Sequence, residues 1–140
     1  MTIIYPGQDL LSAKTPLSNG NKVTWHKSFA TDVLFFGGEA KYTENNIFKT
    51  VQLDWNEGVD ICEELEDGSL FDLAGQLLRE SWLPSGSCPV SKGSFRAKNP
   101  FRLRNVTVSQ ESKRYIFNLQ VGYSRDKLVF TTTYDVLVVG

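Results

Sequence analysis

The chain has 140 residues, a formal net charge of −1 and 41% hydrophobic residues, and its aromatic residues are nine Phe, five Tyr and three Trp. A chain of this length is expected to form a single domain, residues 1–140, that buries about two-thirds of its unfolded surface. The composition excludes a disordered protein, and the apolar runs are too short to span a bilayer. Residues 1–9 lack the basic and apolar regions of a leader, so we expect either a cytosolic chain or a mature chain whose leader was replaced by Met1.

Charge is divided unevenly along the chain. Residues 1–80 hold six Lys or Arg against thirteen Asp or Glu, whereas residues 81–140 hold nine against three. Complementary strands and loops explain most such asymmetry, and a basic face for an anionic partner is the alternative. Basic residues in one extended segment mostly alternate and are expected to meet phosphate or lipid head groups from one side of a strand: Lys92, Arg96, Lys98, Arg102 and Arg104. The pI of about 5.8 argues against nucleic acid.

Apolar and polar residues alternate through much of the chain, as they do in half-buried β-strands. The last two predicted strands are separated by Ser124–Asp126, a connection short enough for an antiparallel hairpin. In all, the alternation predicts strands at residues 23–27, 33–36, 47–55, 101–108, 114–123 and 127–139.

One segment has helical rather than strand periodicity. Between Ser69 and Trp82 the apolar residues recur every three or four positions, which predicts an amphipathic helix. Ser69 and Asp72 have the spacing of a capping box, and Pro84 ends the segment. Gly75 within it costs about 1 kcal/mol relative to Ala, so the helix is expected to depend on packing. Strands, turns and one helix together predict an all-β, two-sheet antiparallel β-sandwich with a short helical insertion, with a small barrel as the alternative.

Residues suited to catalysis are scarce. His26 is the only histidine and lies in an alternating strand, where a structural or simply exposed role is expected. A Ser-His-Asp site through His26 would need a nucleophile, and no Gly-x-Ser-x-Gly motif occurs. Glycine-rich phosphate loops are missing from the sequence, and two Cys with one His do not make an ordinary zinc site. We therefore expect a protein that is not an enzyme and has no cofactor or metal.

A run of acidic residues separates Lys49 from Arg79, with no basic residue between them. Hard cations such as calcium prefer clustered oxygen ligands, but the spacing and the glycine of an EF-hand loop are missing. Negative charge is also favoured near the N-terminus of a helix. A solvated acidic loop before the helix is therefore the preferred interpretation.

Cys62 and Cys88 lie on either side of the predicted helix. A bond between them would close a loop of about 27 residues and stabilise the fold by about 3.5 kcal/mol in the chain-entropy model. In a cytosolic chain they would instead be two buried thiols. Asn105 begins a glycosylation sequon, Asn-Val-Thr, which is used only on the secretory route. The even cysteine count and the sequon favour an oxidising compartment.

The sequence resembles the ML (MD-2-related lipid-recognition) superfamily, in particular its ganglioside-activator-like members and related insect secreted proteins. The resemblance is carried by Asp60-Ile61-Cys62, the helix, and the stretch from Cys88-Pro89 through Gly93 to Phe95, and it covers roughly residues 45–139. It implies an immunoglobulin-like sandwich that binds or transfers lipid, a Cys62–Cys88 disulfide, and a secreted or endolysosomal location. The chain departs from the family pattern in lacking further cysteine pairs and a leader.

On this basis we expect acyl chains to lie between the sheets, each buried CH₂ contributing about 0.8 kcal/mol. The lining of this lipid cavity is expected to be Phe35, Trp55, Leu73, Leu77, Phe95, Phe117, Leu119, Phe130 and Tyr134. The head group would lie near Lys92, Arg96 or Lys98. Trp82 and Leu83 either form a loop that enters a membrane surface or close the helix onto the sandwich.

Two alternatives to a lipid carrier remain. One is an interaction module, or receptor accessory protein, with a filled core and a protein or carbohydrate partner. The other is an extracellular carrier of small apolar chemosensory signals. Cavity volume separates the first alternative from a lipid carrier, and ligand size separates the second.

Overall fold

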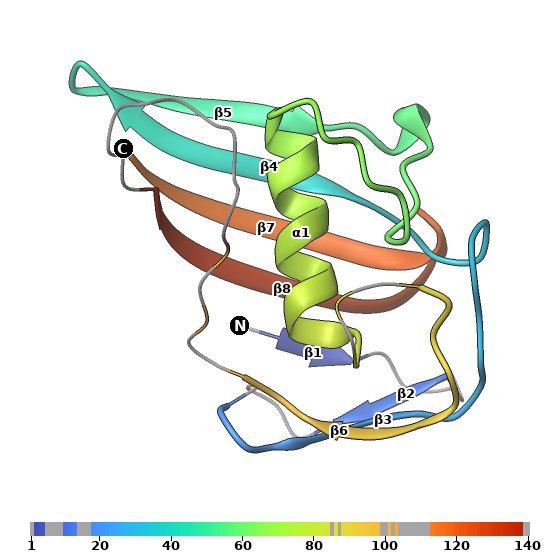
Figure 1. Ribbon diagram of the computed structural model, residues 1–140. Coiled ribbons are helices and arrows are strands. Elements are labelled where there is room, and N and C mark those ends of the chain that lie inside the picture. The colour runs from blue at the N-terminus through green and yellow to red at the C-terminus, as the bar shows by residue number, and fades with distance from the viewer. Residues whose placement is uncertain are drawn as a thin grey trace.

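The computed structural model describes residues 2–4, 10–13, 18–84, 86, 88–98, 101, 103 and 113–138 (Figure 1). The strands and helices form in the following order: β1 (Thr2–Ile4), β2 (Leu11–Ala13), β3 (Lys22–Trp25), β4 (Phe35–Glu44), β5 (Ile47–Leu53), the 3-10 turn η1 (Trp55–Glu57), α1 (Leu70–Trp82), β6 (Gly93–Arg96), β7 (Lys113–Ser124) and β8 (Lys127–Val138).

The strands form two antiparallel sheets, which confirms the predicted all-β, two-sheet architecture. The larger sheet has the order β1-β8-β7-β4-β5, and the smaller has the order β2-β3-β6. Helix α1 runs across the strands of the larger sheet, and the smaller sheet lies near the end of the helix (Figure 1). The Trp25 indole in β3 donates a 2.8 Å hydrogen bond to the carbonyl of Trp82, the last helical residue. The helix is thus held between the two sheets.

The core forms between α1 and the inward face of the larger sheet. Strand β7 alternates as predicted from Tyr115 to Val121, with these odd-numbered residues buried. They face the apolar side of α1, where Leu73, Leu77 and Leu78 are 4% exposed or less. Strand β7 departs from the predicted alternation beyond Val121, because register shifts against β8 leave Tyr123 exposed.

Strand β4 continues through Gly37 and Gly38, which directly follow the predicted strand at residues 33–36. A Cβ at Gly38 would lie 2.0 Å from the backbone oxygen of Asn118 in β7, so the strands can pair closely only with glycine here. The predicted 33–36 strand therefore begins later, at Phe35, and runs on to Glu44. Short strands β1, β2 and β6 were not predicted, and most of the predicted 101–108 strand lies outside the described residues.

The predicted helix and its cap are confirmed. The Ser69 side chain accepts a 3.1 Å hydrogen bond from the backbone N–H of Asp72. Gly75 is explained by packing, because a Cβ there would lie 3.0 Å from Nη1 of Arg79 and 3.5 Å from Phe36. The Arg79 guanidinium donates to the carbonyls of Ile61 and Glu63, and burial lowers the pKa of this side chain.

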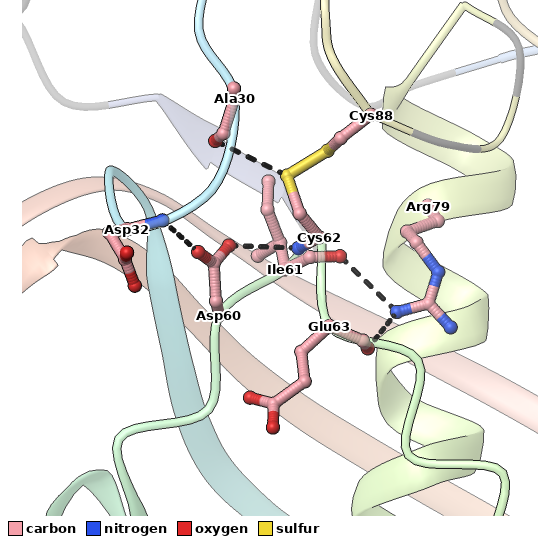
Figure 2. The surroundings of a disulfide bond; sticks show 8 residues. All are labelled: Ala30, Asp32, Asp60, Ile61, Cys62, Glu63, Arg79 and Cys88. Atoms are coloured by element: carbon pink, nitrogen blue, oxygen red, sulfur yellow. Dashed lines mark hydrogen bonds between the residues drawn. A yellow bond between two sulfur atoms is a disulfide. The ribbon is translucent and has the colours of Figure 1, made fainter.

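A disulfide between Cys62 and Cys88 holds the segment before α1 to the segment after it (Figure 2). The Asp60 carboxylate, 5% exposed, accepts hydrogen bonds from the backbone N–H groups of Asp32 and Cys62. The carbonyl oxygen of Ala30 lies 3.4 Å from Sγ of Cys62. The Asp-x-Cys sequence thus fixes a turn against the chain that enters β4, which gives the motif a structural role.

Candidate functional site

The outer face of the small sheet carries hydroxyl and basic side chains. Ser12, Thr24 and Ser94 occupy paired positions on β2, β3 and β6, on the side of the sheet opposite the buried Val23 and Trp25. Oγ1 of Thr24 lies 2.8 Å from Oγ of Ser94, so the hydroxyls form a row across the strands. Because side chains alternate along a strand, the residues two positions away share this face.

Those neighbouring positions are Lys22 on β3 and Arg96 on β6, which pair directly across the strands. Both side chains are exposed, and Nη1 of Arg96 donates a hydrogen bond to the carbonyl oxygen of Gly20 at 3.1 Å. Like charges at directly opposed positions destabilise a sheet. Exposed Lys92 and Lys98 lie just before and just after β6, at positions that continue its alternation, and we call the whole group the basic face: Lys22, Lys92, Arg96 and Lys98.

No acidic side chain neutralises the basic face within the described part of the chain. The sequence has no Asp or Glu between Asp9 and Asp32, nor between Glu80 and Glu111, and these two acid-free stretches contain all three strands. Elsewhere, by contrast, Lys41 pairs with Glu39 at 3.3 Å and Lys49 with Glu44 at 3.2 Å. An open depression of about 430 Å³ lies on the basic face, between Ser12, Lys22 and Arg96.

Three of the basic residues proposed to contact a head group, Lys92, Arg96 and Lys98, are exposed and belong to this face. Arg102 and Arg104 lie outside the described residues. Lys22 was not identified from the sequence, because its pairing with Arg96 of β6 joins distant parts of the chain. A count of charges over the two stretches without Asp or Glu, rather than over the two halves of the chain, would have identified Lys22 as part of a basic surface.

The residues expected to line a lipid cavity lie mostly in a packed core. Leu73 and Leu77 of α1 are 2% and 4% exposed, and both belong to the buried apolar core. Phe117, Leu119 and Phe130 are 1% exposed or less. The expectation of an open cavity at these five side chains is therefore wrong, because the apolar side of the helix fills the space between the sheets.

The other four expected lining residues have different positions. Trp55 lies on the outer face of the larger sheet, where its indole N–H donates to Oε1 of Gln120 at 3.1 Å. Phe35 is half-buried, and strand alternation directs it away from the side on which Phe36 lies. Phe95 and Tyr134 are half-buried against the core, where burial raises the pKa of the Tyr134 phenol.

Trp82 and Leu83 do not form an exposed membrane loop. They are 1% and 2% exposed, and the Trp82 ring packs on Phe130 with 4.3 Å between ring centroids. Of the two roles considered for this pair, the structure shows the second, in which Trp82 closes the helix onto the sandwich. The helix end is apolar because it is enclosed by both sheets.

His26 has a hydroxyl partner on the basic face. Its Nε2 lies 3.0 Å from Oγ of Ser12, and both residues are exposed. Among the described residues no carboxylate bonds the other ring nitrogen, so a third group that would orient the imidazole is missing from this part of the chain.

The acidic residues near α1 cap backbone turns. Asp54 accepts from the N–H of Asn56, and Asp67 accepts from the N–H of Ser69. Hydrogen bonds from the side chain and then from the backbone of Ser69 lower the pKa of the Asp67 carboxyl. No group of three metal-ligating side chains occurs among the described residues. In that same part of the chain, no helix has the length and apolar character needed to cross a membrane. Asn105, the predicted glycosylation site, lies outside it.

Comparisons with protein-family models, with curated proteins and with solved structures find no match to this chain.

Proposed function

We propose that this protein is a non-enzymatic lipid-binding protein that recognises anionic head groups through the basic face. The observation that carries this proposal is the direct opposition of Lys22 and Arg96 on a face without acidic side chains. The repulsion between these two side chains is not compensated within the protein. Such a repulsion is expected at a binding site, where an external anion supplies the missing negative charge.

The energetics favour an extended anionic surface as the partner. Each Lys or Arg near an anionic bilayer contributes about 1 kcal/mol, so the four residues of the basic face supply about 4 kcal/mol. The hydroxyls of Ser12, Thr24 and Ser94 add hydrogen-bond donors for phosphate oxygens. The attraction is screened within about 10 Å at an ionic strength of ~0.1 M, so binding is expected to weaken steeply with salt.

One further observation supports a lipid partner, and another supports the proposed location. The motifs shared with the lipid-recognition superfamily include the segment that leads from Cys88 into β6, the strand that carries Arg96. The Cys62–Cys88 disulfide is typical of oxidising compartments, which supports a secreted or endolysosomal location.

A second candidate is insertion of an acyl chain between the layers beside the basic face. Phe95, Phe101 and Leu103 are partly buried apolar residues that pack against the core, and Phe95 directly precedes the exposed Arg96 of the basic face. The Phe101 ring contacts Tyr134 edge-on with 6.4 Å between centroids. An acyl chain that enters here would displace half-buried side chains rather than the closed core.

The proposal is tested by co-sedimentation with vesicles of phosphatidylcholine alone and with vesicles containing phosphatidylserine. We expect binding only to the anionic vesicles. The double variant Lys22→Gln, Arg96→Gln removes two charges, or about 2 kcal/mol, and is expected to weaken binding about 30-fold.

The matched control is Lys41→Gln, Lys49→Gln, which removes the same charge from ion-paired lysines on the larger sheet. This control is expected to retain most of the affinity. Equal losses in the two double variants, or equal binding to neutral and anionic vesicles, would overturn the proposal.

Acyl insertion is tested separately, by native mass spectrometry after incubation with mixed lipids and by titration with a fluorescent fatty acid. Saturable binding that Phe95→Ala weakens would support it. Vesicle binding without a retained lipid would leave the basic face as the site and exclude the acyl pocket.

A further inference from the structure

A groove of about 540 Å³ lies on the outer face of the larger sheet, on the side of the strands away from α1. This volume is within the range of small-molecule sites. Trp55 lies along it, with side chains of β4, β5, β7 and β8 that project to the same side. None of these side chains belongs to the basic face, so the groove is a separate site.

The backbone beneath the groove makes room for the tryptophan. A Cβ at Gly37 would lie 2.6 Å from Cδ1 of Trp55 and 2.9 Å from the carbonyl oxygen of Leu53. The indole edge therefore rests directly on the glycine backbone. Its N–H is fixed by Gln120 at 3.1 Å, so the ring is held in one orientation at the groove. Rigid positioning on strands is what a binding site requires.

A row of linked polar side chains forms the rest of the lining. Oγ1 of Thr133 donates to Oδ1 of Asn118 at 3.0 Å, and Nδ2 of Asn118 donates to Oε1 of Glu39 at 3.3 Å. Register places Gln52 of β5 next to Glu39, so the row crosses four strands. Amide, carboxylate and hydroxyl groups together offer both donors and acceptors to a ligand.

From this arrangement we propose that the groove binds a neutral saccharide. A sugar combines apolar C–H faces, which suit an indole ring, with hydroxyls that donate and accept hydrogen bonds at once. The lining holds two carboxylates, of Glu39 and Asp54, and one guanidinium, of Arg125, and Glu39 also pairs with Lys41, so the groove has no excess of positive charge that would favour phosphate or another anion. The polar row disfavours an acyl chain. A network that is already formed loses little entropy when a ligand binds.

The test uses isotope-labelled protein and follows the indole N–H resonances of the three tryptophans during titration with glucose, galactose, mannose, N-acetylglucosamine and lactose. Trp25 is 0% and Trp82 is 1% exposed, so they serve as internal controls. We expect a saturable shift of the Trp55 resonance alone, with a dissociation constant of ~1 mM for the best sugar.

Asn118→Ala interrupts the polar row and is expected to weaken the best sugar about tenfold. Thr50→Ala is the matched control, since Thr50 is exposed on the same face of β5 but lies outside the groove. Unchanged Trp25 and Trp82 resonances show that a variant is folded. If Asn118→Ala is not folded, Gln120→Ala is used in its place.

The inference is overturned if none of the five sugars shifts the Trp55 resonance. It is also overturned if Asn118→Ala and Gln120→Ala bind as the unmodified protein does, or if inorganic phosphate produces the same shift. Lys22→Gln is expected to leave sugar binding unchanged, which separates this site from the basic face.

Discussion

Lys22 and Arg96 are directly opposed on strands β3 and β6, and both side chains are exposed to solvent. A pair of opposite charges at these positions would stabilise the sheet, whereas two positive charges destabilise it. The strand pairing is maintained by the buried residues of the same strands, Val23 and Trp25, which are 0% exposed. The sheet can therefore tolerate a repulsion on its outer face.

Reversal of one charge should separate stability from lipid binding. Lys22→Glu places a carboxylate opposite Arg96 and is expected to raise the free energy of unfolding by about 0.5 kcal/mol. The same change should weaken binding to anionic vesicles. Urea denaturation and co-sedimentation measure the two effects. Adding Arg96→Glu restores like charges and should remove the gain in stability, and a gain that persists in the double variant would contradict the cross-strand explanation.

Gly75→Ala should destabilise the protein although it improves helix propensity. Alanine in a helix interior is favoured by about 1 kcal/mol over glycine. Here the new Cβ would lie 3.0 Å from Nη1 of Arg79, which is anchored on two backbone carbonyls and cannot easily move. We expect a net loss of about 1 kcal/mol in urea denaturation.

The control for this prediction is Gly75→Ala in an Arg79→Gln background, where the crowding is relieved. In that background the alanine should be neutral or stabilising. A gain in stability from Gly75→Ala alone would show that the guanidinium can shift.

Removal of the disulfide should lower stability without changing the architecture. Cys62→Ser with Cys88→Ser opens a loop whose closure is worth about 3.5 kcal/mol in the chain-entropy model. Thermal unfolding measures the loss, and reduction of the unmodified protein should lower its unfolding temperature toward that of the variant. The unfolding temperature of the variant itself should not change when reductant is added.

The ion pair between Arg114 and Asp135 should contribute a pH-dependent increment of stability. The Arg114 guanidinium, hydrogen-bonded to Asp135, lowers the pKa of that carboxyl. A lowered folded-state pKa means that the contribution is present above the unfolded-state pKa and is lost as pH falls through the folded-state value.

Asp135→Asn should therefore be less stable than the unmodified protein at neutral pH and equal to it in acid. The difference is small because both side chains are exposed. Urea denaturation over an acid-to-neutral series measures it, with Asp126→Asn in the β7–β8 turn as control. A difference that is constant with pH would rule out the ion pair as its cause.

Local signals predicted much of the fold. The periodicity from Ser69 to Trp82 predicted α1 because one apolar side of a helix is visible in sequence, and the alternation after Arg114 predicted the β7–β8 hairpin. Of the small sheet only β3 was predicted, as part of the strand at residues 23–27, because β2 and β6 have three and four residues, too few for a period to appear. The pairing of β3 with β6 joins distant segments, so Lys22 could not be placed opposite Arg96.

The interior was predicted less well than the elements that enclose it. A sequence identifies inward-facing apolar residues such as Phe117 and Leu119, but it does not say whether they meet one another or an open space. Here α1 fills that space. Trp55 was assigned to the wrong face because it follows β5 into a turn, where strand alternation ends.

The order of strands in the larger sheet has a consequence for synthesis on the ribosome. Strand β1, near the start of the chain, pairs only with β8 in this sheet, and β4 joins the sheet through β7. Strand β1 can therefore pair only after β8 has been synthesised, and the β4–β5 hairpin, which can form by itself, can join the rest of the sheet only after β7 has been synthesised. The larger sheet is completed by pairings between segments that are distant in sequence, so its folding is expected to be slow.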